Sequence, residues 1–185
     1  MTAPGLLLVV HAHPYPFTSR GCAALLDSIA DVPGLAVRRL YDLYPDFDID
    51  VAAEQEALRA AGAVVWLHPL YWYTAPALLK HWFEKVLAVG FAYGERGSAL
   101  AGKPCLWVIT TGGGEYSPQG IHHHPFADFT PVVEMTARYS GMRWEEPFVV
   151  NDVTGHSDDA LRARGRELRE RLLALSLAAP GQGQP

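Results

Sequence analysis

Short apolar runs that alternate with segments of helical periodicity constrain the fold of this chain more than any other feature. Such runs are typical of strands buried on both faces, as in a parallel sheet with helices on either side. One run carries Arg38 and Arg39, which indicates a strand at the edge of the sheet. The predicted strands are residues 6–10, 36–40, 63–67, 105–110 and 148–150.

Helical patterns fill the intervals between these strands and follow the last one. The predicted helices are residues 19–30, 51–61, 75–88, 126–140 and 157–175. This alternation predicts an α/β fold with a doubly wound, five-stranded parallel sheet of order 2-1-3-4-5 and helices on both faces. Ligands of such sheets bind beyond the carboxyl ends of the strands, beside strands 1 and 3. One domain is expected over residues 1–177, and the Pro-, Gly- and Gln-rich residues 178–185 are expected to form a disordered tail.

Composition narrows the classes of function. The formal net charge of -5 disfavours nucleic acid as a partner, because phosphate binding needs a basic face. The arginines near the C-terminus alternate with glutamates, which predicts a solvated helix face. Cys22 and Cys105 form no metal or redox pattern, and the first apolar run is too short for a signal peptide or a membrane span. We therefore expect a cytoplasmic protein.

The loop after the first strand, residues 11–20, leads directly into a helix. Thr18 and Ser19 can cap that helix, whose free N–H groups and positive dipole end suit an anion. His13 and Arg20 add donors and charge, so the loop indicates a phosphate site, although Thr18 or Ser19 could also merely cap the helix. His11 lies nearer the strand and is expected to be a packed structural histidine.

The loop after the third strand contains three consecutive aromatic residues, Tyr71, Trp72 and Tyr73. Too few residues separate them from the next helix to bury all three. A flat aromatic ligand lying against Trp72 or Tyr73 accounts for them, and packing on the following helix is the alternative.

The loop after the fourth strand begins Thr110-Thr111 and continues with three glycines. Glycines let backbone N–H groups approach a ligand closely, and such a nest favours the negative charge that a reduced flavin carries near N1 and O2. Tyr116 and His122 add groups that can relay a proton. The run His122–His124 has no acidic or Cys partner at ligand spacing, so we expect no metal. Together the three loops indicate a mononucleotide with a planar ring.

Several stretches resemble a known family: HAHPYPFTSR (11–20), YPDFDID (44–50), HPLYWY (68–73) and TTGGGEYSPQGIH (110–122). On these stretches the chain resembles the NAD(P)H:quinone oxidoreductase family of the flavodoxin-like superfamily. Within it, the chain is most similar to the ancillary subunits of bacterial glutathione-regulated potassium-efflux systems. The resemblance spans residues 6–175.

The resemblance implies a flavin cofactor and NAD(P)H as co-substrate. The extra C-terminal region of the long quinone reductases is missing here, which leaves less protein to hold an adenosine, so we expect FMN, with FAD as the alternative. The cofactor-binding residues, from the loops and the resemblance together, are His13, Thr18, Ser19, Arg20, Gly21, Cys22, Leu70, Tyr71, Trp72, Tyr73, Thr110, Thr111, Gly112 and Gly113. Cys22 stands where the family usually has asparagine, which weakens the expected phosphate contacts there.

The resemblance also implies the reaction. Tyr116 and His122 take the positions of a catalytic tyrosine and histidine. NAD(P)H gives hydride to the flavin and leaves, and a quinone-type acceptor then takes the hydride in a ping-pong sequence. The family places its site across a homodimer, so Tyr93 is expected to line the partner's acceptor pocket with Tyr116 and His122.

Two alternatives remain beside this enzyme. The protein could act chiefly as a regulatory subunit that activates a potassium-efflux transporter, at the inner face of the membrane. An electron carrier of the flavodoxin type is disfavoured, because Tyr116, His122 and the aromatic loop would then have no task.

Overall fold

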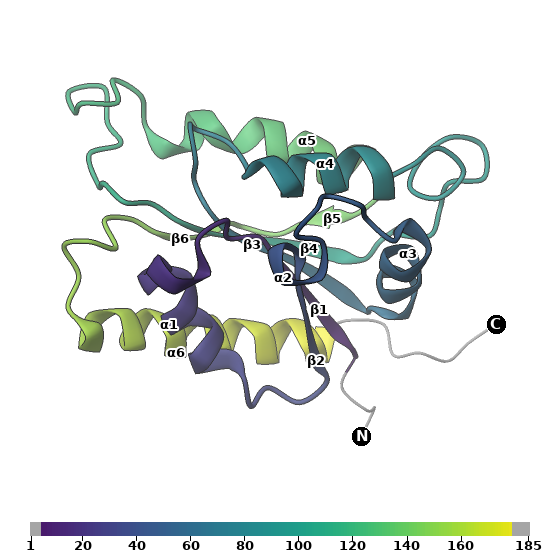
Figure 1. The fold of residues 1–185 in the computed structure, drawn as a ribbon, viewed down its shortest axis with the longest axis horizontal. Coiled ribbons are helices and arrows are strands. Elements are labelled where there is room, and N and C mark those ends of the chain that lie inside the picture. Colours follow the sequence, from purple (N-terminus) through teal and green to yellow (C-terminus); the bar gives the residue numbers. More distant parts are fainter. Residues whose placement is uncertain (1–4, 179–185) are drawn as a thin grey trace.

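The computed structural model describes residues 5–178 of the chain, which form three layers (Figure 1). A parallel sheet is the middle layer. Helices α3, α4 and α5 pack on one face of this sheet, and helices α1 and α6 pack on the other. The strands are β1 Leu7–His11, β2 Leu35–Arg39, β3 Ala63–Pro69, β4 Pro104–Thr110, β5 Arg143–Trp144 and β6 Phe148–Val150. The helices are α1 Arg20–Ile29, α2 Leu40–Leu43, α3 Val51–Ala60, α4 Ala77–Val86, α5 Thr130–Tyr139 and α6 Asp158–Ala178, with 3-10 turns at Pro16–Thr18 and Phe126–Phe129.

The sheet has the order β2-β1-β3-β4-β5, and every pair of neighbours is parallel. This confirms the predicted doubly wound order. The fifth position differs from the prediction because two short strands share it. Strand β5 pairs with the start of β4 through Arg143 and Pro104, and β6 pairs with its end through Val150 and Thr110. Pro147, which has no N–H to donate, lies between the two strands.

Other element boundaries differ from the predictions by a few residues. The helix predicted over 75–88 begins at Ala77, because Pro76 has an extended ψ of 150°. The helix predicted over 126–140 is divided into a 3-10 turn and α5, and Pro131 lies in the first turn of α5. The short helix α2 was not predicted. Helix α6 continues to Ala178, and residues 179–185 of the predicted tail lie outside the described residues.

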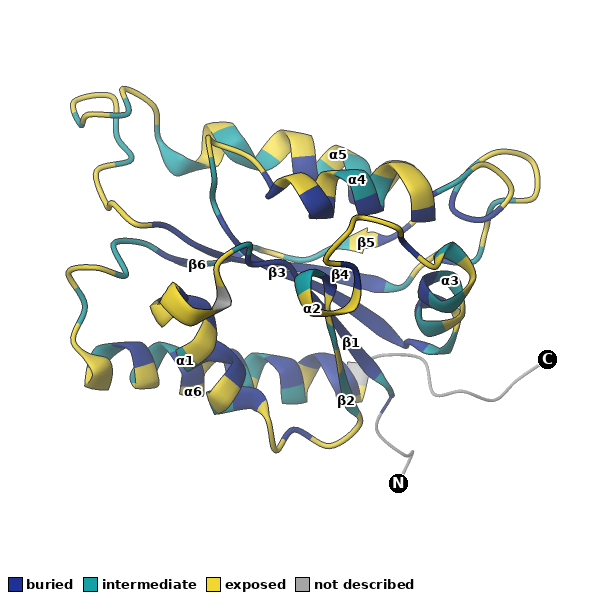
Figure 2. Cartoon of the chain, viewed as in Figure 1, coloured by how far each residue is buried: buried dark blue, intermediate teal, exposed yellow. Residues whose placement is uncertain are grey.

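Both faces of the sheet are buried, which explains why its strands are continuous apolar runs (Figure 2). On the α4–α5 side the largest buried side chains are Trp66, Trp82 and Trp107. Leucines, isoleucine and valines from α1, α6 and the strands fill the other side. The edge strand β2 is only partly buried, as its two arginines predicted.

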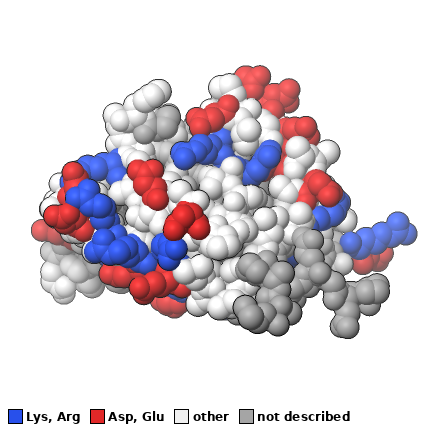
Figure 3. Space-filling view, turned by 90° about the horizontal axis from the view of Figure 1, so that it is seen from below, with Lys and Arg blue, Asp and Glu red and all other residues white. Residues whose placement is uncertain are grey.

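The arginines of α6 are largely paired, as expected for a solvated helix face. Arg162 pairs with Asp159 at 2.6 Å, and Arg169 pairs at 2.9 Å with Asp31, which follows the end of α1. Basic and acidic side chains alternate over the face seen in Figure 3. Within residues 5–178, no helix combines the length and the apolar character that a membrane crossing requires.

Candidate flavin site

Three loops meet at the carboxyl edge of the sheet, at the left of Figure 1. Backbone hydrogen bonds join them: Ala12 N donates to Leu67 O at 3.0 Å, and Leu70 N donates to Thr110 O at 2.8 Å. The loops after β1, β3 and β4 are therefore held side by side, at the switch point where doubly wound sheets bind ligands.

His13 lies in the first loop and is buried. Its Nδ1 accepts a 3.1 Å hydrogen bond from the backbone N–H of Tyr15, and burial lowers the pKa of the imidazole. A neutral ring that accepts at Nδ1 carries its proton on Nε2. His13 therefore offers an Nε2–H donor. His11 is buried as well, and burial lowers its pKa to about 3, which fits the structural role expected for it.

Ser19 occupies the N-cap position of α1, but its side chain makes no capping hydrogen bond. The hydroxyl of Thr18 donates instead to Tyr15 O at 3.2 Å. The interpretation that Thr18 or Ser19 merely caps this helix is therefore wrong. Among the described residues, the buried Ser19 hydroxyl makes no close hydrogen bond and interacts only weakly with the neutral Cys22 thiol. It lies beside the first N–H groups of α1, which no residue of their own helix can satisfy, and together these donors suit an anion.

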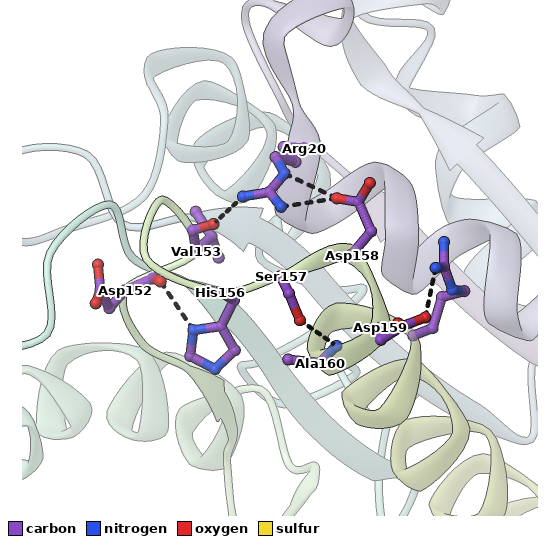
Figure 4. Close-up of polar contacts among 9 residues, drawn as sticks. Arg20, Asp152, Val153, His156, Ser157, Asp158, Asp159 and Ala160 are labelled. Atoms are coloured by element: carbon purple, nitrogen blue, oxygen red, sulfur yellow. Dashed lines mark hydrogen bonds and ion pairs between the residues drawn. The ribbon is translucent and has the colours of Figure 1, made fainter.

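Arg20 contributes less to this loop than its charge suggested. Its guanidinium binds Asp158 at 2.7 Å and the carbonyl of Val153 at 3.0 Å, so the side chain lies against the start of α6 (Figure 4). Its backbone N–H, at the first position of α1, is the donor that it offers a phosphate in this loop. Gly21 follows, and a Cβ there would lie 2.7 Å from Val153 Cγ1, which explains why the position needs glycine.

Cys22 is buried, and its Sγ lies 3.4 Å from Thr110 Oγ1. Burial raises the pKa of this thiol to about 11, so it is neutral at physiological pH. Its side chain links α1 to the end of β4 and adds no charge to the site.

The loop after β3 is a tight turn that presents aromatic rings. Tyr71 and Thr74 exchange backbone hydrogen bonds of 3.1 and 3.0 Å, and the two residues between them have positive φ, 48° for Trp72 and 63° for Tyr73. These features define a type I′ turn, in which glycine or asparagine is usual. Trp72 is 87% exposed, so packing on the following helix does not account for it. Tyr71 instead contacts the ring of His13 edge-on at 6.0 Å.

The loop after β4 uses its threonines internally and leaves glycine N–H groups open. The hydroxyl of Thr111 donates to Gly113 O and accepts from Asp152 N at 3.2 Å, and Thr110 is engaged with Cys22. Across residues 5–178, the N–H groups of Gly112 and Gly113 have no partner. A Cβ at Gly112 would meet nothing within 4 Å, so this backbone is open to a ligand.

Tyr116 and His122 lie together. Their rings stack at 4.0 Å with an interplanar angle of 11°. His122 Nδ1 lies 3.4 Å from the hydroxyl of Tyr73, while its Nε2 is buried and has no partner among the described residues. Burial raises the pKa of the Tyr116 phenol. His124 turns away to Asp128 at 2.8 Å, and in the described part of the chain no three His, Cys, Asp or Glu side chains are grouped to hold a metal.

Tyr93 lies apart from these residues. It lies in the segment between α4 and β4, which precedes β4 and is not one of the three loops that follow strands. Its ring lies 5.1 Å from that of Tyr139, and it lines a cavity of about 520 Å³ between α4 and α5. Within one chain, Tyr93 does not join Tyr116 and His122.

A fourth loop, between β6 and α6, also lies at this edge and was not predicted. Its Asp152 N–H donates to Gly113 O at 3.2 Å, and its Thr154 hydroxyl donates to Gly112 O at 2.8 Å. The loop therefore holds the glycine backbone in place from behind. The sequence did carry a signal for this loop. It follows the predicted strand 148–150, and a loop after a strand of a parallel sheet lies at the same edge as the other three.

The doubly wound sheet, with unpaired donors and an exposed indole at its switch point, defines an α/β protein with a candidate ligand site at that edge. The family model of the flavodoxin-like fold matches residues 6–172. The glutathione-regulated potassium-efflux system ancillary protein KefF of Salmonella typhi is 46% identical over 170 residues, which cover 91% of this chain and 96% of that protein. KefF of Enterobacter sp. (strain 638) is 44% identical over 168 residues, with the same coverage of 91% and 96%.

Two solved structures are also similar. General stress protein 14 of Treponema denticola, in complex with FMN, has a TM-score of 0.86 and 30% identity, and covers 92% of this chain and 99% of its own. An NADPH-quinone reductase from P. pentosaceus has a TM-score of 0.75 and 25% identity, and covers 96% and 99%. The chain belongs to the flavodoxin-like NAD(P)H:quinone oxidoreductase family.

Proposed function

We propose that this protein is an FMN-dependent NAD(P)H:quinone oxidoreductase that transfers two electrons to quinone-type acceptors. The observation that carries the proposal is the Ser19 hydroxyl, which is buried at the N-terminus of α1 with no close hydrogen bond and only the neutral Cys22 thiol as a weak neighbour. An unsatisfied buried donor is costly unless a ligand satisfies it, and this one lies where the fold binds a phosphate.

The residues present fit a flavin mononucleotide. The Nε2–H of His13, the hydroxyl of Ser19 and the N–H groups of Arg20 and Gly21 would hold its phosphate. Trp72 would lie against its ring. The open N–H groups of Gly112 and Gly113 would donate to its ring oxygens. The bound flavin supplies hydride transfer, and the protein supplies orientation and electrostatic complementarity.

Tyr116 and His122 would serve proton transfer at the edge of this site. The raised pKa of Tyr116 keeps its phenol protonated at neutral pH, so it can donate, and His122 stacks on the same ring. Tyr116→Phe and His122→Ala should slow flavin reduction and leave the amount of bound flavin nearly unchanged. Wild-type rates of flavin reduction in both variants would refute this role.

FMN is proposed over FAD because a 30% identical structure is an FMN complex. Mass analysis of the flavin released from the purified protein distinguishes the two cofactors.

A homodimer is proposed from the exposed apolar side chains of α5. Val132, Met135 and Tyr139 are each more than 60% exposed on this helix, beside the α4–α5 cavity. A second copy bound there would bring its own Tyr93 toward the acceptor pocket of the first, which Tyr93 does not line within one chain. Sedimentation should give a dimer, and Met135→Glu should give monomers with an intact fold.

The test of the enzymatic proposal is an anaerobic experiment in two steps. NADH or NADPH should bleach the flavin absorbance of the FMN-loaded protein, and a quinone added afterwards should restore it. A bound flavin that neither nucleotide bleaches would overturn the proposed reaction. The relative rates with NADH and NADPH also identify the preferred donor.

A regulatory role is the second candidate, and a specific observation favours it. The 46% identity to the KefF ancillary protein extends over 96% of that protein. We therefore propose that the chain also associates with a potassium-efflux transporter at the inner face of the membrane. Co-purification with the transporter tests this proposal. Transporter activation by the His122→Ala variant, with its oxidoreductase activity reduced, would separate the two roles.

A further inference from the structure

Tyr73 has a backbone conformation that tyrosine rarely adopts, and its ring is nonetheless held in a defined place. Its φ of 63° places it in the left-handed region, at the second central position of the turn between Tyr71 and Thr74. Its ring stacks on Phe129 at 5.2 Å with an interplanar angle of 22°. A strained residue whose side chain is fixed by packing indicates a functional constraint.

The hydroxyl of Tyr73 contacts His122, which comes from a different loop. It lies 3.4 Å from His122 Nδ1, and the two rings meet edge-to-face at 5.7 Å. Tyr116 stacks on the imidazole face. His122 is therefore held by its face and by one nitrogen, while its other nitrogen, Nε2, is buried without a partner among residues 5–178. That free nitrogen lies on the side of Gly113, since a Cβ added to Gly113 would be 3.8 Å from it.

We propose that Tyr73 is a positioning residue that keeps the proton of His122 on Nε2. A phenol O–H that donates to Nδ1 leaves the neutral imidazole only one place for its own proton. The Nε2–H then points toward the open glycine backbone, where the proposed function places the flavin ring. This inference rests on that function for its consequence, but the contact itself belongs to the flavin-free protein.

The packing of Tyr73 provides a matched variant. Tyr73→Phe keeps the ring that stacks on Phe129 and meets His122 edge-on, and it removes only the hydroxyl. A purely structural role of the ring would survive this change. A role of the hydroxyl in fixing the tautomer would not.

The primary measurement is the ¹⁵N NMR spectrum of the His122 side chain in flavin-free protein near pH 8, where the shifts of the two ring nitrogens distinguish the tautomers. The wild type should be mainly the Nε2–H tautomer, and Tyr73→Phe should give a mixture of the two. An Nδ1–H tautomer in the wild type, or identical spectra in both proteins, would overturn the proposal. If the variant does not fold, the tautomer found in the wild type alone still supports or overturns the proposal.

A second measurement uses the FMN-loaded protein. In Tyr73→Phe saturated with FMN, the bound flavin should be reduced roughly three- to tenfold more slowly than in the wild type, since only part of the population carries the proton on Nε2. An unchanged rate of flavin reduction would overturn the positioning role. If the protein bound no FMN, the proposed function would fail. If it reduced quinones normally while His122 carried its proton on Nδ1, the role of Tyr73 alone would fail.

Discussion

The indole N–H of Trp107 on β4 donates a 2.8 Å hydrogen bond to Nε2 of His68 on β3, and both side chains are completely buried. The other nitrogen of His68, Nδ1, lies 2.9 Å from the carbonyl of Pro69 and donates to it. Both ring nitrogens therefore have fixed roles that require a neutral imidazole. Burial accordingly lowers the pKa of His68 to about 4.

This arrangement predicts that the protein loses stability in mild acid. Between about pH 6.5 and pH 4 the unfolded chain binds a proton at His68 that the folded chain does not, so the free energy of unfolding falls as the pH falls. His11, with a pKa lowered to about 3, acts in the same direction. Each histidine contributes up to about 1.4 kcal/mol per pH unit.

Urea unfolding at pH 7.5, 6.0 and 5.0 measures this loss. His68→Gln should have a shallower pH dependence than the wild type, whatever its stability at pH 7.5. Equal free energies of unfolding for the wild type at pH 7.5 and pH 5.0 would contradict the assignment.

Glu54 is the second buried polar group on which the fold depends. Its carboxylate has no exposed surface and accepts from Arg38 Nε at 2.8 Å, the Tyr44 hydroxyl at 2.6 Å and Trp82 Nε1 at 2.9 Å. Glu54→Gln removes the charge that Arg38 opposes, and it should lower the free energy of unfolding by about 3 kcal/mol. Glu56→Gln on the exposed face of the same helix is the control and should stay within about 0.5 kcal/mol of the wild type. Similar values for the two variants would refute this role.

Lys103 caps the carboxyl end of α3 through its side chain. Its Nζ lies 2.7 to 2.8 Å from the carbonyl oxygens of Leu58, Arg59 and Ala61, which the helix itself leaves unsatisfied. Lys103→Met should therefore cost about 2 kcal/mol in thermal or chemical unfolding. Lys85→Met, at an exposed position of α4, should cost much less.

The strands were predictable because their residues carry the information locally. Strands β1, β3 and β4 are buried throughout, and such strands are continuous apolar runs in any context. Strand β5 was not predictable, because its residues carry no such local signal. It has two residues, Arg143 and Trp144, of which the first is exposed, and it pairs only because β4 lies beside it.

The site was predictable in location but not in detail. Each of the three loops directly follows a strand in the sequence. Because the strands are parallel, their carboxyl ends meet at one edge of the sheet, and the loops meet there too. The sequence could not indicate that Arg20 pairs with Asp158, because 138 residues separate them. It also could not show that the Ser19 hydroxyl makes no close hydrogen bond. Both facts depend on how α1 packs against α6 and the end of β4.

Ser19→Ala should separate flavin binding from stability. The hydroxyl makes no close hydrogen bond in the described structure, so its removal should change the free energy of unfolding by less than about 0.5 kcal/mol. Loss of one hydrogen bond to a charged phosphate should weaken FMN binding roughly tenfold. Fluorescence titration of flavin-free protein with FMN measures the dissociation constant. Ser28→Ala, whose hydroxyl donates to Ala24 O within the same helix, should bind FMN like the wild type.

Native mass spectrometry of the purified protein, before and after addition of FMN, tests the central claim most directly. The account predicts one FMN for each chain, retained in the assembled protein and identified as FMN when the protein is denatured. A chain that remains free of flavin after incubation with excess FMN would contradict the assignment of the three loops as a flavin site.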